Sequence, residues 1–198
     1  MFHKARWNRI SRLVIITPDS LELPLDGPIV LPLCKSFHLD SCHPADILKF
    51  KLPMVDYLGL VSRDVSDPKY AEEIDQLIAC PTFGQLRPIQ LCLALPAGDR
   101  IFTILFDILG KEATTIKAAL GPESYMGDML FDALAMPSQR STEVPIPELL
   151  PYAKCVMFDL THCSGYNKLA CETAGEKLRV AAEARSRWAG DRVEMNLV

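Results

Sequence analysis

Histidine and cysteine side chains gather at two places in the chain, and these residue types have the most capacity for chemistry. His38, Cys42 and His43 fall within six residues, and His162 is followed directly by Cys163. Imidazole nitrogen and thiolate sulfur are the ligands that zinc prefers, and a structural zinc site needs four. His38, Cys42 or His43, His162 and Cys163 could supply four. No CxxC pair or HxxxH helix accompanies them, so loop histidines and core cysteines are the alternative, and no metal or cofactor is predicted.

The same residues also allow a thiol nucleophile. Cys163 follows the strand-like segment 155–160 and precedes Ser-Gly, which places it at a turn into a helix. A thiol near a helix N-terminus has a lowered pKa and is more nucleophilic. His43 or His162 could act as its base, with Asp159 orienting the imidazole. The alternative is an inert, buried cysteine.

Two aspartates stand inside apolar segments, at Asp107 and Asp159. Burial raises the pKa of a carboxyl group, which is the usual state of a general acid or base. Each aspartate could equally mark a position that faces solvent. No GxGxxG or Walker pattern is present, so the sequence gives no sign of a phosphate-binding loop.

Charge is unevenly distributed along the chain. Residues 1–12 carry four basic side chains and no acidic one, whereas residues 13–165 carry eleven basic and twenty acidic ones. A basic arm on an acidic body could bind phosphate, a membrane surface or an acidic protein surface. The acidic body argues against a nucleic-acid module, which carries a broader basic surface. The predicted interface residues are Arg6, Trp7, Arg9 and Arg12.

The cysteine count and the hydropathy pattern limit the cellular setting. Seven cysteines are an odd number spread over 198 residues, unlike the dense framework of a small secreted domain. The sequence therefore predicts free thiols in a reducing intracellular compartment, most simply the cytoplasm. The longest stretches without a charged residue have eleven residues, too few for a membrane-spanning helix, which needs about 18.

Local patterns predict an α+β fold with a mixed or mainly antiparallel sheet. Segments 88–95 and 100–109 are apolar and joined by Pro-Ala-Gly-Asp, which indicates a hairpin over 88–109 at the centre of the sheet. Further strands are expected at 13–17 and 155–160. Helices are expected at about 67–79, 111–120, 122–135 and 167–189, from capping residues and helical spacing.

The domain and function predictions follow from these patterns. Residues 1–198 are expected to form a single domain, with a basic arm over 1–12 and a proline-rich loop over 137–151. A mean hydropathy of +0.12, the basic arm and the apolar end at 193–198 favour an interaction or assembly protein, such as a subunit of a larger complex or a virus-type structural protein. Its partners would be other proteins or further copies of itself. The alternatives are a small intracellular enzyme using a Cys/His or buried Asp site, and a small-molecule-binding α+β domain.

Overall fold

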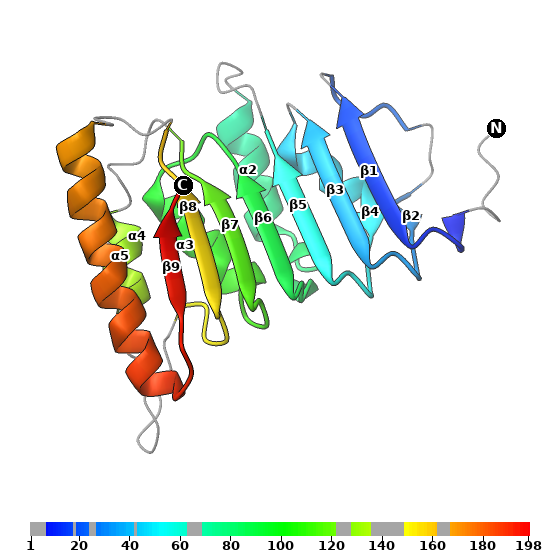
Figure 1. Cartoon of the computed structure of the whole chain (residues 1–198). Helices are drawn as coiled ribbons and strands as arrows, with labels where there is room; N and C mark the ends of the chain where they lie inside the picture. The colour runs from blue at the N-terminus through cyan, green and yellow to red at the C-terminus, as the bar shows by residue number, and fades with distance from the viewer. Residues whose placement is uncertain are drawn as a thin grey trace.

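A single sheet of seven parallel strands organises the molecule (Figure 1). The computed structural model describes residues 7–17, 19–23, 27–41, 43–62, 69–121, 128–135, 149–161 and 167–198. The strands are β1 (Arg12–Thr17), β3 (Ser36–Ser41), β5 (Tyr57–Val61), β6 (Gln90–Ala94), β7 (Thr115–Ala119), β8 (Cys155–Asp159) and β9 (Glu194–Leu197). A second, two-stranded parallel pair joins β2 (Ile29–Val30) to β4 (Phe50–Lys51).

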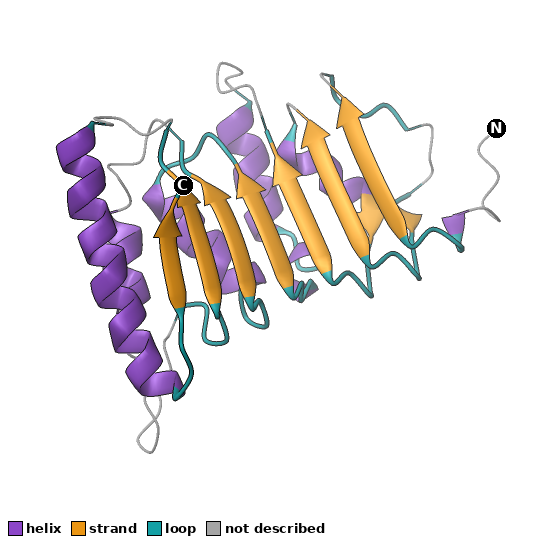
Figure 2. Ribbon diagram, in the orientation of Figure 1, coloured by secondary structure: helices purple, strands orange, loops and turns teal. Residues whose placement is uncertain are grey.

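The strands lie side by side in their sequence order, β1-β3-β5-β6-β7-β8-β9. Every connection therefore steps in the same direction, and because parallel crossovers are right-handed, the connections lie on one face of the sheet. The α-helices are α2 (Tyr70–Ala79), α3 (Asp99–Leu109), α4 (Asp128–Ala135) and α5 (Lys168–Ala189), with 3₁₀-helices η1 (Pro44–Lys49) and η2 (Phe83–Gln85). Figure 2 shows the helices behind the strands, with the front of the sheet uncovered.

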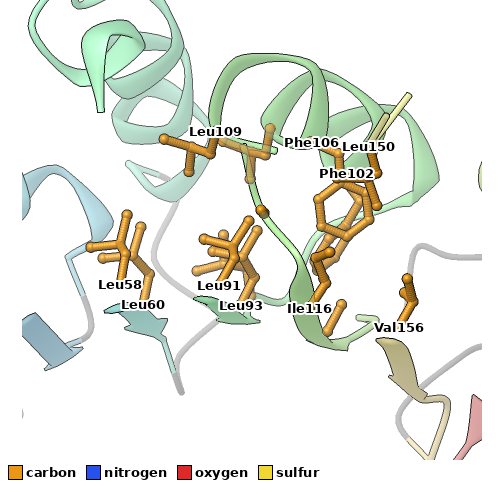
Figure 3. Packing of buried hydrophobic residues seen from close by; sticks show 14 of the residues in the cluster. Leu58, Leu60, Leu91, Leu93, Phe102, Phe106, Leu109, Ile116, Leu150 and Val156 are labelled. Atoms are coloured by element: carbon orange, nitrogen blue, oxygen red, sulfur yellow. The ribbon is translucent and has the colours of Figure 1, made fainter. Parts of the chain in front are cut away.

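The core lies between the helices and the covered face of the sheet. Successive side chains of a strand point to opposite faces, and those that point toward the helices are apolar except for Thr17 at the end of β1 and Ser41 at the end of β3. Leu91 and Leu93 of β6 and Ile116 of β7 are buried beneath the helix layer (Figure 3). On the helix side, Phe106 of α3 packs against Phe158 of β8, with 6.4 Å between ring centroids. This layer is the folding core of the protein.

The predicted α+β fold with a mixed or mainly antiparallel sheet centred on a hairpin at 88–109 is wrong. β6 does occupy the first half of that segment, but residues 99–109 form α3. The buried residues of α3 (Phe102, Leu105, Phe106 and Leu109) fall at helical spacing, and the exposed Arg100 and Asp107 lie on the opposite side of the helix. The hairpin prediction followed the apolar composition of the segment and the turn-like residues before it, and it overlooked this spacing.

The helix predicted over 111–120 is also wrong, because residues 115–119 form β7 in the middle of the sheet. Its Ala and Lys residues favour a helix in isolation, but burial between β6 and β8 overrides that preference. Predicted strands at 13–17 and 155–160 correspond to β1 and β8. The end of the chain, predicted only to be apolar, forms the edge strand β9.

Three predicted helices correspond to helices of the structure. α5 matches the helix predicted at 167–189: Asn167 accepts a hydrogen bond from the Ala170 N–H at 2.9 Å, and Gly190 ends the helix with φ 69°. α2 falls within 67–79, and α4 forms the last eight residues of 122–135. Residues 122–127, and all but 149–151 of the predicted proline-rich loop 137–151, lie outside the described residues.

One buried cation fastens α5 to the rest of the helix layer. Arg185 is 1% exposed, and its guanidinium donates to the carbonyl oxygens of Leu134 at 2.9 Å, Leu149 at 2.6 Å and Leu150. Burial lowers the pKa of Arg185 to about 10. Leu134 lies in the last turn of α4, where carbonyl groups lack helical partners, so this contact caps α4 and holds α5 against it.

Candidate functional site

The uncovered face of the sheet is the most unusual feature of the molecule. Wholly parallel sheets occur almost only with both faces covered by helices, yet no helix of the described residues lies in front of these strands (Figure 2). We call this surface the open face. Its side chains form three rows across the sheet. The rows are Arg12, Ser36, Tyr57, Gln90, Thr115, Cys155 and Glu194; then Val14, His38, Gly59, Cys92, Lys117, Met157 and Asn196; then Ile16, Asp40, Val61, Ala94, Ala119 and Asp159.

An ordered group of side chains occupies the middle of the open face. The His38 ring lies across β5, with Nδ1 only 2.2 Å from where a Cβ atom on Gly59 would stand. The same ring stacks beside Tyr57, with 6.5 Å between centroids and 16° between planes. A side chain at position 59 would therefore displace the His38 ring.

The phenol of Tyr57 is tied to the neighbouring strand. Burial raises the pKa of Tyr57, the nearby Cys92 thiol with its hydrogen bond raises it further, and the Arg12 guanidinium acts in the opposite direction. The neutral phenol is thus favoured, and Tyr57, Cys92 and His38 form a connected patch over three strands.

A shallow hollow of about 210 Å³ adjoins this patch. It exists because Ala94 and Ala119 are short, so the surface dips between β6 and β8. Met157, Asp159 and Lys117 stand around it, and so do Cys92 and Val198. The open face therefore offers an apolar depression with a carboxylate and an ammonium group at its margin. Such a mixed surface is typical of protein contacts, in which polar groups surround an apolar centre.

Asp159, predicted as an orienting carboxylate, lies at the end of β8. Its Oδ1 accepts the Thr161 N–H at 2.9 Å and the Thr161 hydroxyl at 2.7 Å, which closes a turn after the strand. Asp107, the second aspartate considered, is exposed on α3. Neither carboxylate is the buried general acid that an apolar sequence context suggested.

His43, the predicted base, lies between β3 and η1. Its Nδ1 is 2.7 Å from Glu73 Oε1 of α2, and its backbone N–H donates to the Ser41 hydroxyl at 3.1 Å. Ser41 in turn donates to Asp46 at 3.0 Å, and Asp46 also accepts the Lys49 ammonium at 2.6 Å. These contacts join β3, η1 and α2, so the ring is engaged in holding elements together.

The structure does not bring the predicted catalytic and metal-binding residues together. β3 and β8 are four strand spacings apart, so His43 and Asp159 are separated by about 19 Å across the sheet. His38 lies on the open face of β3, and Cys42, His162 and Cys163 fall outside the described residues. No cluster of three His, Cys, Asp or Glu residues suited to a metal occurs in the described part of the chain.

The predicted interface residues divide between two environments. Trp7 is half-buried and packs against the core, while Arg9 is exposed. Arg12 begins β1 and is exposed in the first row of the open face. Arg6 lies outside the described residues.

Most of the open face escaped sequence reasoning. Tyr57, Lys117 and Met157 were not singled out, because an exposed row becomes visible only once its strands are aligned. One signal in the sequence was the pattern Thr-Ile-Lys-Ala-Ala at 115–119, whose alternating residues point to opposite faces of the strand.

Comparisons with protein-family models, curated proteins and solved structures found no match to this chain. No described helix is long and apolar enough to cross a membrane.

Proposed function

We propose that this chain is a non-enzymatic interaction protein that binds a protein partner on the open face. The observation that supports this is a parallel sheet whose described helices all lie on one face. The residues on the other face form a surface that is exposed or half-buried, except at Asp40 and Gly59, which are buried. Proteins built from stacked parallel units use such continuous surfaces for binding.

The composition of the open face supports a protein partner. The open face carries the basic side chains of Arg12 and Lys117 and the carboxylates of Asp159 and Glu194, so no single sign of charge dominates. Nucleic acid and anionic membranes require a predominantly basic surface. The apolar hollow beside Met157 would receive an apolar side chain, with polar contacts around it.

The strand order argues against the common arrangement of an α/β enzyme. Open α/β sheets bind substrates in a crevice where the strand order reverses. The seven strands follow one another without reversal, so the described sheet has no such point. Two larger cavities lie elsewhere, one beside β9 and one beside β4.

Thiol labelling tests the proposal, because Cys92 and Cys155 are half-exposed on the open face. We compare labelling of purified protein with labelling in an extract of its native cells. We expect Cys92 and Cys155 to react several-fold more slowly in the extract, while Cys80, after α2, is unchanged. Ala119→Arg, which fills the hollow with a charged side chain, should restore the reactivity of both cysteines.

A matched control distinguishes partner binding on the open face from a general slowing of thiol labelling in the extract. Ala133→Arg on α4 introduces the same side chain on the opposite side of the sheet and should leave the protection intact. Equal labelling of Cys92 and Cys155 in both conditions would count against the proposal. So would protection that survives Ala119→Arg, because the partner would then bind elsewhere.

A further inference from the structure

The two edges of the sheet differ in what lies beside them. Among the described strands, β1 pairs only with β3 and β9 only with β8, so each has one free edge. Figure 1 shows α5 standing beyond β9, displaced outward from the sheet. A groove of about 860 Å³ runs between this helix and β9. Among the described residues, no comparable helix flanks β1.

The groove has the shape that an additional strand needs. On α5 it is lined along one side of the helix, where Gly175, Ala182 and Ser186 leave space and Leu178 adds an apolar surface. Charged side chains (Arg179, Glu183 and Arg187) border it. Opposite stands β9, with the apolar Met195 and Leu197 turned to the helix side. An inserted strand would thus gain a backbone edge on one side and a helix to cover it.

Backbone hydrogen bonds show which groups of β9 are available. The N–H groups of Glu194 and Val198 donate to β8, at Lys154 O (2.9 Å) and Phe158 O (2.8 Å). Because donors alternate along a strand, the N–H and C=O groups of Met195 and Leu197 point into the groove.

The same alternation applies to the free edge of β1. The Ser11 carbonyl accepts from Lys35 and Ser36 on the β3 side. The N–H and C=O groups of Arg12, Val14 and Ile16 therefore point outward. The two edges present complementary rows of donors and acceptors with the same strand direction.

We infer that β1 of a second copy of this chain enters the groove beside β9 as a further parallel strand. Leu13 and Ile15 must lie on the same face of the sheet as Met195 and Leu197. Because side chains alternate between the two faces, only registers that differ by two residues meet this condition. The register that aligns the strands fully pairs Arg12 with Glu194, Leu13 with Met195, Val14 with Asn196, Ile15 with Leu197 and Ile16 with Val198.

This register matches charge and exposure. Arg12 would approach Glu194, which already accepts Arg192 at 3.3 Å on the surface. Ile16 and Val198 are 71% and 74% exposed, and they would cover each other. Leu13 and Ile15, half-buried at the β1 edge, would become fully covered by α5.

The contact joins two different surfaces, so it is heterologous and leaves a free β1 and a free groove at the ends of each assembly. Copies would add head to tail, extending one sheet and one open face. This inference does not depend on the proposed function, because none of the groove residues except Glu194 and Asn196 belongs to the open face.

Sedimentation over a range of concentrations tests the inference on the full chain. We expect the average mass to rise above 22.0 kDa as concentration increases. Val14→Pro removes an outward N–H from an edge strand, where proline is tolerated, and should abolish the rise. Val14→Thr keeps the N–H and the β-branched shape, and it should associate like the wild type.

A charge exchange tests the register and remains informative if Val14→Pro does not fold. Arg12→Glu should weaken association by about fivefold, and Glu194→Arg added to it should restore the affinity. A constant mass of 22.0 kDa would overturn the inference. So would association that neither Val14→Pro nor Arg12→Glu affects, because copies would then meet at another surface. Ala119→Arg should leave this association unchanged, which keeps it distinct from binding on the open face.

Discussion

The two faces of the sheet are built from alternate residues of the same strands, yet they differ in character. In β6, Leu91 and Leu93 point into the core, while Gln90, Cys92 and Ala94 point outward. The covered face is apolar apart from Thr17 and Ser41 at the ends of β1 and β3, whereas the open face mixes both charges, amides, thiols and small residues. One face thus stabilises the fold. The open face is available for contacts with other molecules.

The largest expected difference between the faces is in stability. Phe106→Ala should lower the free energy of unfolding by about 3–5 kcal/mol, because the ring is fully buried between Phe102 and Phe158 and its loss leaves a cavity. Met157→Ala, on the open face of β8, should cost below about 1 kcal/mol. Urea denaturation of both variants measures the difference. Equal losses would mean that the open face is part of the folding core.

This contrast also explains how far the sequence could predict the fold. The last helix was predictable because Asn167 and Gly190 mark its ends with specific backbone roles. α3 was not recognised, because the largely apolar composition of its segment hid the helical spacing of Phe102, Leu105, Phe106 and Leu109. β7 was not either, because its helix-favouring alanines are held in a strand by β6 and β8. Local composition cannot report the neighbours that decide such segments.

A smaller effect on stability should show whether side chains of the open face pack against one another or are merely exposed. Gly59→Ala should destabilise the protein by about 1 kcal/mol, because the new Cβ displaces the His38 ring. In a His38→Ala background the sign should reverse. The same change should then stabilise by about 0.5–1 kcal/mol, because alanine restricts the unfolded chain more than glycine does.

Thermal or urea unfolding of the four proteins in this cycle gives the coupling energy directly. Additive effects would show that His38 is not held over Gly59, and the patch would lose its ordered centre.

The candidate site was less predictable than the fold, for a related reason. His38 and Arg12 were both singled out, one as a metal ligand and one as an interface residue, but nothing in the sequence indicates that they share a face with Tyr57 and Cys92. Their proximity depends on the parallel pairing of four strands, β1, β3, β5 and β6, which long connections separate in the sequence. A one-residue shift in any register would turn the side chains of that strand to the opposite face.

The smallest expected effect concerns pH and the phenol of Tyr57. Its pKa in the folded protein is raised, chiefly by burial and then by Cys92. A group with a raised folded pKa contributes stability below its unfolded pKa of about 10, and that contribution is lost as pH rises through the folded pKa. Tyr57→Phe should therefore match the wild-type pH dependence below about pH 10 and fall less steeply above it.

Phenolate absorbance isolates this residue, because the difference between the wild type and Tyr57→Phe removes the other four tyrosines. The Tyr57 midpoint should lie above the ordinary value of about 10. Cys92→Ala should lower it only in part, since burial is the larger cause. A midpoint at or below the ordinary value would show that Tyr57 is as hydrated as an isolated surface side chain. The open face would then lack an ordered centre, and the contrast with the covered face would be one of simple exposure.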